Sequence, residues 1–267
     1  IVLLRIFFNI DLTCITLSLI IIKWIKTKLF VGPVSKNIVD VIIEQANIID
    51  SPIGLIPSRR QIDFDNGYVN NWRTKDFVSY VREKTDNVII VRDHAGPDQG
   101  TFKDNGIDSI NNDVDECFDI IHLDPWKKFQ NSNEALQETI NLIETISAKS
   151  DDVCFEVGTE EAIKKYTSKE FEEFLNKLKV ITKEKFKRIK YAVIQSGTRL
   201  ELNKNIGKFN KNKSIEYINI CKKFNILSKE HNGDYLTASE IKERFKLGLD
   251  AINLAPEFGF IETKCIL

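Results

Sequence analysis

The chain has 267 residues, 42% of them hydrophobic and 29% charged, which is the composition of a folded globular domain with a sizeable core. Its 38 basic and 39 acidic residues give a formal net charge of -1, so no overall positive field draws it to nucleic acid or to an anionic membrane. An anionic ligand must therefore be bound by local charge, and we expect no nucleic-acid partner.

Residues 1–28 differ from the rest of the chain. They contain an apolar run without charge from Leu12 to Ile22, and the chain starts at Ile1 and contains no methionine. We expect that the true start is missing and that this segment is either an extra buried or interfacial element or translated upstream sequence. A membrane anchor is less favoured, because a spanning helix needs about 20 apolar residues.

From Lys28 onward, short β-branched runs alternate with longer helical stretches. The run from Asn87 to Asp93 is almost continuously apolar, as is typical of a strand covered on both faces in a parallel sheet. Strands are predicted at residues 29–32, 53–57, 87–93, 119–123, 153–157, 191–195, 226–229 and 251–254. Helices are predicted at residues 35–48, 74–83, 108–117, 133–148, 168–188, 214–224 and 238–247.

Strict alternation of strands and helices predicts a parallel sheet with right-handed crossovers. Eight strands favour closure into a (β/α)₈ TIM barrel, and we expect residues 29–267 to form one such domain. The stretch left for an eighth helix is short, so we expect the barrel to be truncated at its C-terminus. An open doubly wound sheet is the alternative, but no G-x-G-x-x-G follows the first strand, so the dinucleotide-binding version has no support.

The five cysteines are odd in number and none forms a C-x-x-C pair, which argues against a zinc ribbon and against a disulfide scaffold. Cys117 and Cys154 lie in apolar surroundings and are expected to be buried thiols. We therefore expect a reducing, cytoplasmic location.

Polar side chains gather at the ends of the predicted strands, where the catalytic groups of (β/α)₈ barrels lie. The three histidines, His94, His122 and His231, lie at or just after the third, fourth and seventh strands. Other polar groups at strand ends are Ser58, Arg59, Arg60, Gln61, Asp93, Asp124, Glu156, Gln195, Glu230, Asp234 and Asn253. Because burying so many polar groups without a ligand costs free energy, we predict a functional site at this rim.

Imidazole and carboxylate groups together suit a divalent metal such as zinc. Two imidazoles and one carboxylate, from His94, His231 and Glu156, would leave positions open for a substrate oxygen. His122 is either a residue that supports the ligands or a substrate-binding residue. The alternative is that each histidine serves only as a hydrogen-bonding residue.

Several other features allow two interpretations. Arg59 and Arg60 are expected to recognise phosphate or carboxylate, although the pair could also lie on a solvated loop. The basic stretch Lys204–Lys213 is predicted to be a mobile loop that could close over a phosphate. Trp72 and Trp126 either stack on a sugar or cover the rim.

Six short motifs in sequence order carry a family resemblance. They are Ser58 to Tyr68, Asp93-His94-x-Gly96-Pro97, Ile121-His122-Leu123-Asp124, Val157-Gly158-Thr159-Glu160, Gln195-x-Gly197 and Glu230-His231-x-x-Asp234-Tyr235. With these motifs the chain resembles, over roughly residues 29–260, the accessory subunits of class II tagatose-bisphosphate aldolase. These subunits are often described as non-catalytic and are sometimes called tagatose-6-phosphate kinases.

The resemblance extends, more distantly, to the catalytic class II aldolases. It implies that Asp93 moves protons, that His94, Glu156 and His231 bind zinc, and that Asn253 lies near the phosphate site. The substrate-binding residues that we expect are Ser58, Arg59, Arg60, Gln61, His122, Asp124, Gln195, Gly197, Asp234 and Asn253.

The chain departs from the catalytic family at two places. Where that family has a further zinc histidine after the sixth strand, this chain has Gln195-Ser196-Gly197-Thr198, as the accessory subunits do. Pro256 stands where the catalytic family tends to have a phosphate-binding threonine.

Two functions follow as hypotheses. The first is a lyase that cleaves a sugar phosphate by a metal-assisted retro-aldol reaction, with Asp93 as the proton carrier. The second is a non-catalytic subunit that binds and stabilises a catalytic aldolase partner. In both cases we expect a sugar phosphate ligand and an oligomer. A sugar-phosphate kinase is disfavoured because no P-loop is present.

Overall fold

The computed structural model describes residues 27–267. The expectations about residues 1–28 therefore fall almost wholly outside the described part of the chain. Within residues 27–267, no helix is both long and apolar enough to span a membrane.

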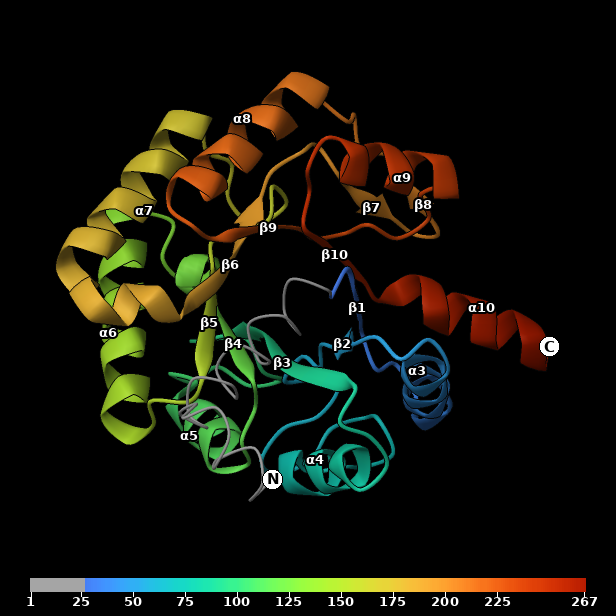
Figure 1. The fold of residues 1–267 in the computed structure, drawn as a ribbon. Coiled ribbons are helices and arrows are strands. Elements are labelled where there is room, and N and C mark those ends of the chain that lie inside the picture. The colour runs from blue at the N-terminus through green and yellow to red at the C-terminus, as the bar shows by residue number, and fades with distance from the viewer. Residues whose placement is uncertain (1–26) are drawn as a thin grey trace, which may run out of the picture.

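Eight parallel strands close into a barrel, in the order β1-β10-β9-β6-β5-β4-β3-β2, which confirms the predicted fold class. Figure 1 shows these strands at the centre of a ring of helices. The strands are β1 (Leu29–Val31), β2 (Ile53–Leu55), β3 (Val88–Ala95), β4 (Ile120–Leu123), β5 (Cys154–Val157), β6 (Ile189–Ile194), β9 (Leu227–Glu230) and β10 (Ala251–Leu254). A short antiparallel hairpin, β7 (Leu200–Glu201) with β8 (Lys204–Asn205), follows β6.

A helix follows each barrel strand. These helices are α3 (Lys36–Ile48), α4 (Thr74–Arg82), α5 (Ile107–Asp115), α6 (Ser132–Lys149), α7 (Ser168–Thr182), α8 (Lys211–Lys223), α9 (Ala238–Lys246) and α10 (Pro256–Ile266). Short 3₁₀ helices, η1 (Pro125–Lys127) and η2 (Lys183–Arg188), follow β4 and α7. The eighth helix, expected to be truncated, is α10, which extends past α3 with no fully buried residue (Figure 1).

Local sequence sets several of the helix boundaries. The side-chain hydroxyls of Thr167 and Thr237 each accept a hydrogen bond from the third backbone N–H of α7 and α9, and a glutamate closes each capping box. The predicted helix 168–188 is divided because Lys183 has a positive φ of 50°, so the α-helix ends and η2 begins there.

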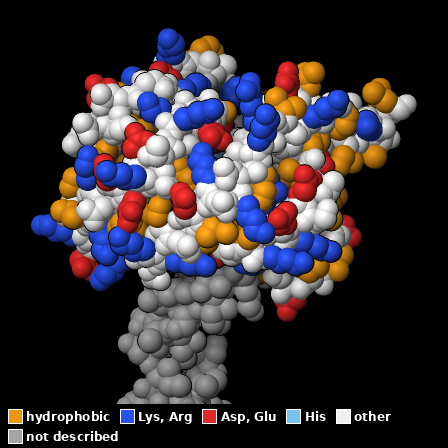
Figure 2. Space-filling model, turned by 90° about the horizontal axis from the view of Figure 1, so that it is seen from above, with side chains coloured by type: hydrophobic (Ala, Val, Ile, Leu, Met, Phe, Trp, Pro, Cys, Tyr) orange, Lys and Arg blue, Asp and Glu red, His pale blue; other side chains and the backbone are white. Residues whose placement is uncertain are grey.

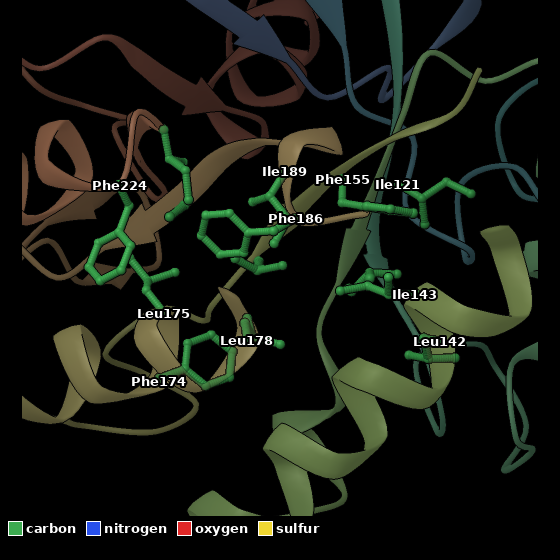
Figure 3. Packing of buried hydrophobic residues seen from close by; sticks show 14 of the residues in the cluster. Ile121, Leu142, Ile143, Phe155, Phe174, Leu175, Leu178, Phe186, Ile189 and Phe224 are labelled. Carbon is green, nitrogen blue, oxygen red and sulfur yellow. The ribbon is translucent and has the colours of Figure 1, made fainter. Parts of the chain in front are cut away.

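The largest apolar cluster lies between the outer face of β4, β5 and β6 and the helices α6, α7 and α8. In Figure 3, Phe174, Leu175 and Leu178 of α7 face Phe155 and other residues of this cluster. Burial on this side fixes the positions of the strand ends β4 to β6, which carry part of the site.

The barrel interior combines apolar and charged side chains. Phe30, Ile89 and Tyr191 are fully buried there, and so are Glu156 and Lys229. On the outer face shown in Figure 2, basic and acidic side chains are interspersed, in line with the small net charge.

Two expectations about individual segments need correction. Cys117 is exposed, not buried, because it follows the end of α5 in a left-handed conformation that turns the chain toward β4, whereas Cys154 is buried on β5 as expected. The stretch Lys204–Lys213, expected as a loop, contains β8 and the first turn of α8.

Candidate active site at the carboxyl ends of the strands

A cavity of about 890 Å³ opens at the carboxyl ends of the barrel strands. The loop after β2, the end of β3, the segment after β9 and the start of α10 surround it. Of the residues predicted from the sequence, those that line the cavity are Ser58, Arg59, Arg60, Gln61, Asp93, His94, His231, Asp234 and Asn253. His122, Asp124, Glu156, Gln195 and Gly197 do not line it.

The three histidines meet at one side of this cavity. The ring centroids of His94 and His122 are 4.9 Å apart, those of His122 and His231 5.0 Å, and those of His94 and His231 5.4 Å. Together with Asp93 they offer four possible ligand atoms that lie within 4.8 Å of one another. The structure thus brings residues from β3, β4 and the end of β9 into one His/Asp cluster.

A bulge in β3 directs His94 into the cluster. The pairing of β3 with β4 shifts register between Arg92 and Ala95, and His94 has a positive φ of 49°. The His94 backbone N–H donates to His122 Nδ1 at 3.3 Å. A non-glycine residue in this backbone region is uncommon and is kept only where surrounding contacts hold it, as they do here.

One nitrogen of His94 is anchored by a buried carboxylate. Nδ1 lies 2.6 Å from Asp124 Oδ2, which also accepts the Thr159 hydroxyl at 3.1 Å. The other nitrogen, Nε2, lies 3.7 Å from Asp93 Oδ1. Burial lowers the pKa of His94, but Asp93 and Asp124 outweigh burial and raise it to about 10. A carboxylate behind one ring nitrogen is the usual support of a metal-binding histidine.

His231 is held in the same way. Its Nε2 lies 2.7 Å from Glu156 Oε1, and its Nδ1 lies 3.8 Å from Glu160 Oε2 at the cavity wall. Burial lowers the pKa of His231, but Glu156 and Glu160 raise it further than burial lowers it. Two imidazoles, each fixed at one nitrogen, therefore direct their second nitrogen toward carboxylates at the cavity.

Glu156 has both oxygens engaged and lies outside the His/Asp cluster. Oε1 contacts His231, and Oε2 accepts from Lys229 Nζ at 2.6 Å inside the barrel. Burial raises the pKa of Glu156, but Lys229 and the neighbouring histidines lower it well below the usual range. The Lys229 ammonium also lies 3.8 Å from the centroid of the Phe30 ring. Glu156 thus orients His231 from behind.

Both ring nitrogens of His122 form hydrogen bonds with backbone groups. Its Nε2 lies 3.0 Å from the Gly158 carbonyl oxygen, and its Nδ1 accepts the His94 N–H. Burial is the main reason why its pKa is lowered, so the ring is neutral at neutral pH. This ring supports the bulge at His94 and the loop after β5.

The donor set at the cavity fits a divalent metal. Asp93 Oδ1 is buried and has no hydrogen-bond partner among residues 27–267, although such a group is costly to bury alone. It lies beside His94 Nε2 and 4.0 Å from His122 Nδ1. Imidazole nitrogens with a carboxylate oxygen are the ligands that zinc and similar cations prefer.

The two arginines after β2, Arg59 and Arg60, differ in exposure and in their ion pairs. The Arg59 guanidinium is buried, donates to both carboxylate oxygens of Asp104 at 2.7 and 2.6 Å, and donates to Asp63 at 2.8 Å. Arg60 is exposed at the cavity and has no ion pair within the described chain. Gln61 lines the cavity, but its Oε1 accepts the Ser58 N–H at 2.8 Å. Arg60 is therefore the cation available to an anionic ligand.

The predicted residues after β6 hold the loops instead of facing the cavity. Gln195 donates to the carbonyl oxygens of Thr159 and Lys164 and accepts the Tyr166 N–H. Gly197 has a φ of +97°, and a side chain there would collide with the Lys208 carbonyl.

The two predicted residues near α10, Asp234 and Asn253, differ from each other in their hydrogen bonds. Asp234 accepts the N–H groups of Ala255 and Glu257 at the start of α10, at 2.8 and 2.9 Å. Asn253 lines the cavity, and its buried Oδ1 has no partner among the described residues.

Sequence reasoning missed two functional neighbours. Lys229 lies on β9 in the barrel interior, and Glu160 lies at the cavity wall with its carboxylate accepting from Asn232 at 2.8 Å. A lysine within a predicted barrel strand was the available signal for Lys229, and Glu160 ends one of the short motifs.

Comparisons with solved structures agree with this fold. The chain is similar to a protein from Sinorhizobium meliloti 1021 described as a probable tagatose 6 phosphate kinase, with a TM-score of 0.74 and 16% identity over 88% of this chain and 66% of that one. It thus spans just under two thirds of that protein. It is also similar to the YdjI aldolase from Escherichia coli K12, with a TM-score of 0.62 and 15% identity over 87% of this chain and 77% of that one.

A third similar structure is the fructose-bisphosphate aldolase from Campylobacter jejuni, with a TM-score of 0.65 and 14% identity over 88% of this chain and 73% of that one. No family model matches the chain, and no curated protein matches it either. The fold therefore resembles that of class II ketose-bisphosphate aldolases, and the chain combines it with a possible His/Asp metal-binding cluster.

Proposed function

We propose that the chain is a metal-dependent lyase of carbohydrate metabolism that cleaves the aldol bond of a ketose phosphate. The observation that supports this most directly is the unpartnered Asp93 carboxylate oxygen next to two imidazoles that buried carboxylates orient. This arrangement opens into a cavity large enough for a sugar phosphate.

His94 Nε2 and His231 Nδ1 would hold the cation, with zinc as the best match to the donor set. When bound, the cation would polarise the carbonyl oxygen of the substrate. Glu156, which the sequence suggested as a ligand, would act by orienting His231, and Asp124 would do the same for His94. Glu160 is the nearest further carboxylate to His231.

Asp93 would accept the proton of the substrate hydroxyl. As the O–H proton moves to Asp93, a carbonyl forms at that carbon and the neighbouring C–C bond breaks. The electron pair of the broken bond would pass to the carbon next to the ketone, and this carbon would then take the proton back from Asp93. Because Asp93 lines the cavity and its side chain is partly exposed, its second carboxylate oxygen can make this contact.

Arg60 would bind the phosphate group. Its guanidinium is exposed at the cavity, whereas Arg59 is already paired with Asp63 and Asp104. Ser58 and Asn253 also line the cavity and offer a hydroxyl and an amide to the sugar.

Cleavage assays with fructose 1-phosphate and with fructose and tagatose 1,6-bisphosphate, in the presence of Zn²⁺ or Co²⁺, test the proposal. We expect triose phosphate to form, EDTA to stop its formation, and Asp93→Asn to slow it at least about 100-fold. Asp98→Asn is the matched control, because Asp98 lies outside the cavity lining and its positive φ of 60° suits asparagine. Cleavage that survives Asp93→Asn would contradict the mechanism.

A non-catalytic accessory subunit is the second candidate. Two observations favour it: Gln195 holds the loop after β5 where the catalytic family has a zinc histidine, and Asp234 occupies the backbone N–H groups at the start of α10. In that case the chain would co-purify with a catalytic aldolase and raise the stability of that partner, and it would show no cleavage alone with any metal.

A further inference from the structure

A second cavity lies on the outside of the barrel, behind the His/Asp cluster. It has a volume of about 200 Å³ and lies where α6 and α7 run side by side (Figure 1). Trp126, Tyr166, Phe171 and Phe174 supply aromatic walls, and exposed polar residues of α6 and α7 form the rim.

The cavity wall contains a buried donor without an acceptor. Trp126 is only 3% exposed, and its indole Nε1–H has no hydrogen-bond partner within residues 27–267. A buried tryptophan N–H normally finds an acceptor, because leaving it unpaired costs free energy. The N–H has almost no accessible surface, so a small shift of the cavity wall would let a ligand acceptor satisfy that donor.

The dimensions and charges of the cavity define the class of ligand. A space of this volume suits a single ring, since a dry apolar cavity of about 150 Å³ holds benzene. The tilted ring pair of Trp126 and Phe174, with centroids 5.5 Å apart, favours an aromatic ligand. The rim carries Glu170, Glu173 and Lys177, so it offers an anion no excess of positive charge.

The same residues also hold the histidines of the first site. The Trp126 backbone N–H donates to Asp124 Oδ1 at 3.2 Å, and Asp124 anchors His94. The Gly158 carbonyl, at the inner wall of the cavity, accepts from His122. A ligand that moves either wall therefore changes the surroundings of His94 and His122.

We propose that this cavity binds a small neutral aromatic molecule with a hydrogen-bond acceptor, such as an aromatic amide, and that its occupancy is transmitted to the histidine cluster. The acceptor bonds the Trp126 indole N–H, and the ring packs among the aromatic walls. This site is separate from the first cavity, and binding there does not depend on the lyase function.

Binding of 4-fluorobenzamide to the full chain, followed by ¹⁹F NMR line broadening, tests the proposal. We expect saturable binding with a dissociation constant on the order of 1 mM, as suits a ligand of this size. Trp126→Phe keeps an aromatic wall but removes the donor, and we expect about fivefold weaker binding. Trp72→Phe, the same change outside this cavity, is the matched control and leaves binding unaltered.

If Trp126→Phe and the unchanged protein bind 4-fluorobenzamide with equal affinity, or if no saturable binding is found, the proposed site is wrong. 4-Fluorotoluene, which has no acceptor, is expected to bind more weakly, and equal binding would overturn the role of the indole N–H. In the metal-free protein, 4-fluorobenzamide is expected to shift the ¹³Cε1 signals of His94 and His122. Binding without these shifts would overturn the link between the two sites.

Discussion

Neighbouring residues of one motif serve different purposes. Arg59 and Arg60 are adjacent after β2, but Arg59 is 5% exposed and paired with two carboxylates, whereas Arg60 faces the cavity. The residues have the same chemistry and differ only in the direction of their side chains. Stability should depend on the first arginine and ligand binding on the second.

We predict that Arg59→Ala lowers the free energy of unfolding by about 3–5 kcal/mol, because Asp63 would remain buried without its partner. Arg60→Ala should change that free energy by less than about 0.5 kcal/mol and weaken phosphate binding. Urea unfolding and a phosphate titration separate the two effects. Equal loss of stability in both variants would contradict this assignment.

The pKa of Asp234 predicts a pH effect on stability. Burial is the main cause that raises its pKa from 3.8 to about 6 in the folded protein. The folded state therefore holds this proton more tightly than the unfolded state. The resulting stability is complete below about pH 4 and is lost as the pH rises through about 6.

Asp234→Asn stays neutral and keeps an oxygen for the N–H groups of Ala255 and Glu257. Relative to the unchanged protein, we expect this variant to gain about 2 kcal/mol of unfolding free energy between pH 4 and pH 7. Urea unfolding at both pH values measures the difference. A difference that is constant with pH would show that the Asp234 carboxyl does not titrate as expected.

At the scale of elements, the end of β3 depends on unusual backbone geometry. The register shift at Arg92 to Ala95 and the positive φ of His94 place the imidazole, and the following loop returns to start α5 at Gly106. Gly106 has a φ of +75°, and a side chain there would collide with the Gly96 carbonyl. The site therefore depends on a glycine that does not itself line the cavity.

We predict that Gly106→Ala costs at least about 1–2 kcal/mol of unfolding free energy, because alanine is strained at this φ and lacks space. The change should also displace His94 and so weaken metal binding. Gly259→Ala is a control, since Gly259 has no positive φ and its nearest neighbours are atoms of the Val34 side chain. Unaltered stability of Gly106→Ala would mean that this loop relaxes freely.

For the whole molecule, the sequence predicted the architecture well. Alternation of strands and helices is a local pattern repeated eight times, so errors of one or two residues at each end do not affect the topology. The sequence also predicted that His94 and His231 meet, because the carboxyl ends of all barrel strands lie at one rim.

Pairing within the site could not be predicted in the same way. Whether Glu156 faces a cation or Lys229 depends on which barrel-interior side chains lie level with each other, and residue spacing alone does not determine this. Arg59 could not be recognised as a buried partner of Asp104, since the two are 45 residues apart. The sequence therefore predicted that polar residues meet at this rim, but not which of them line the cavity or how their side chains pair.

We predict that a bound cation stabilises the entire barrel. At a concentration 100 times its dissociation constant, Zn²⁺ or Co²⁺ should add about 2.7 kcal/mol, which raises the melting temperature by roughly 5–10 °C for a chain of this size. Thermal unfolding with metal and with EDTA measures the shift. A His94→Ala, His231→Ala double variant that keeps the full shift would place the cation elsewhere.

The contact of Asp234 with the start of α10 affects which charged ligands fit the cavity. In many barrels of this kind a phosphate rests at such a helix start, after the seventh and eighth strands. Here the protein supplies its own anion to the N–H groups of Ala255 and Glu257. A sugar charged at one end only, with its phosphate toward Arg60 and a hydroxyl toward Asp234, matches this polarity better than a sugar charged at both ends.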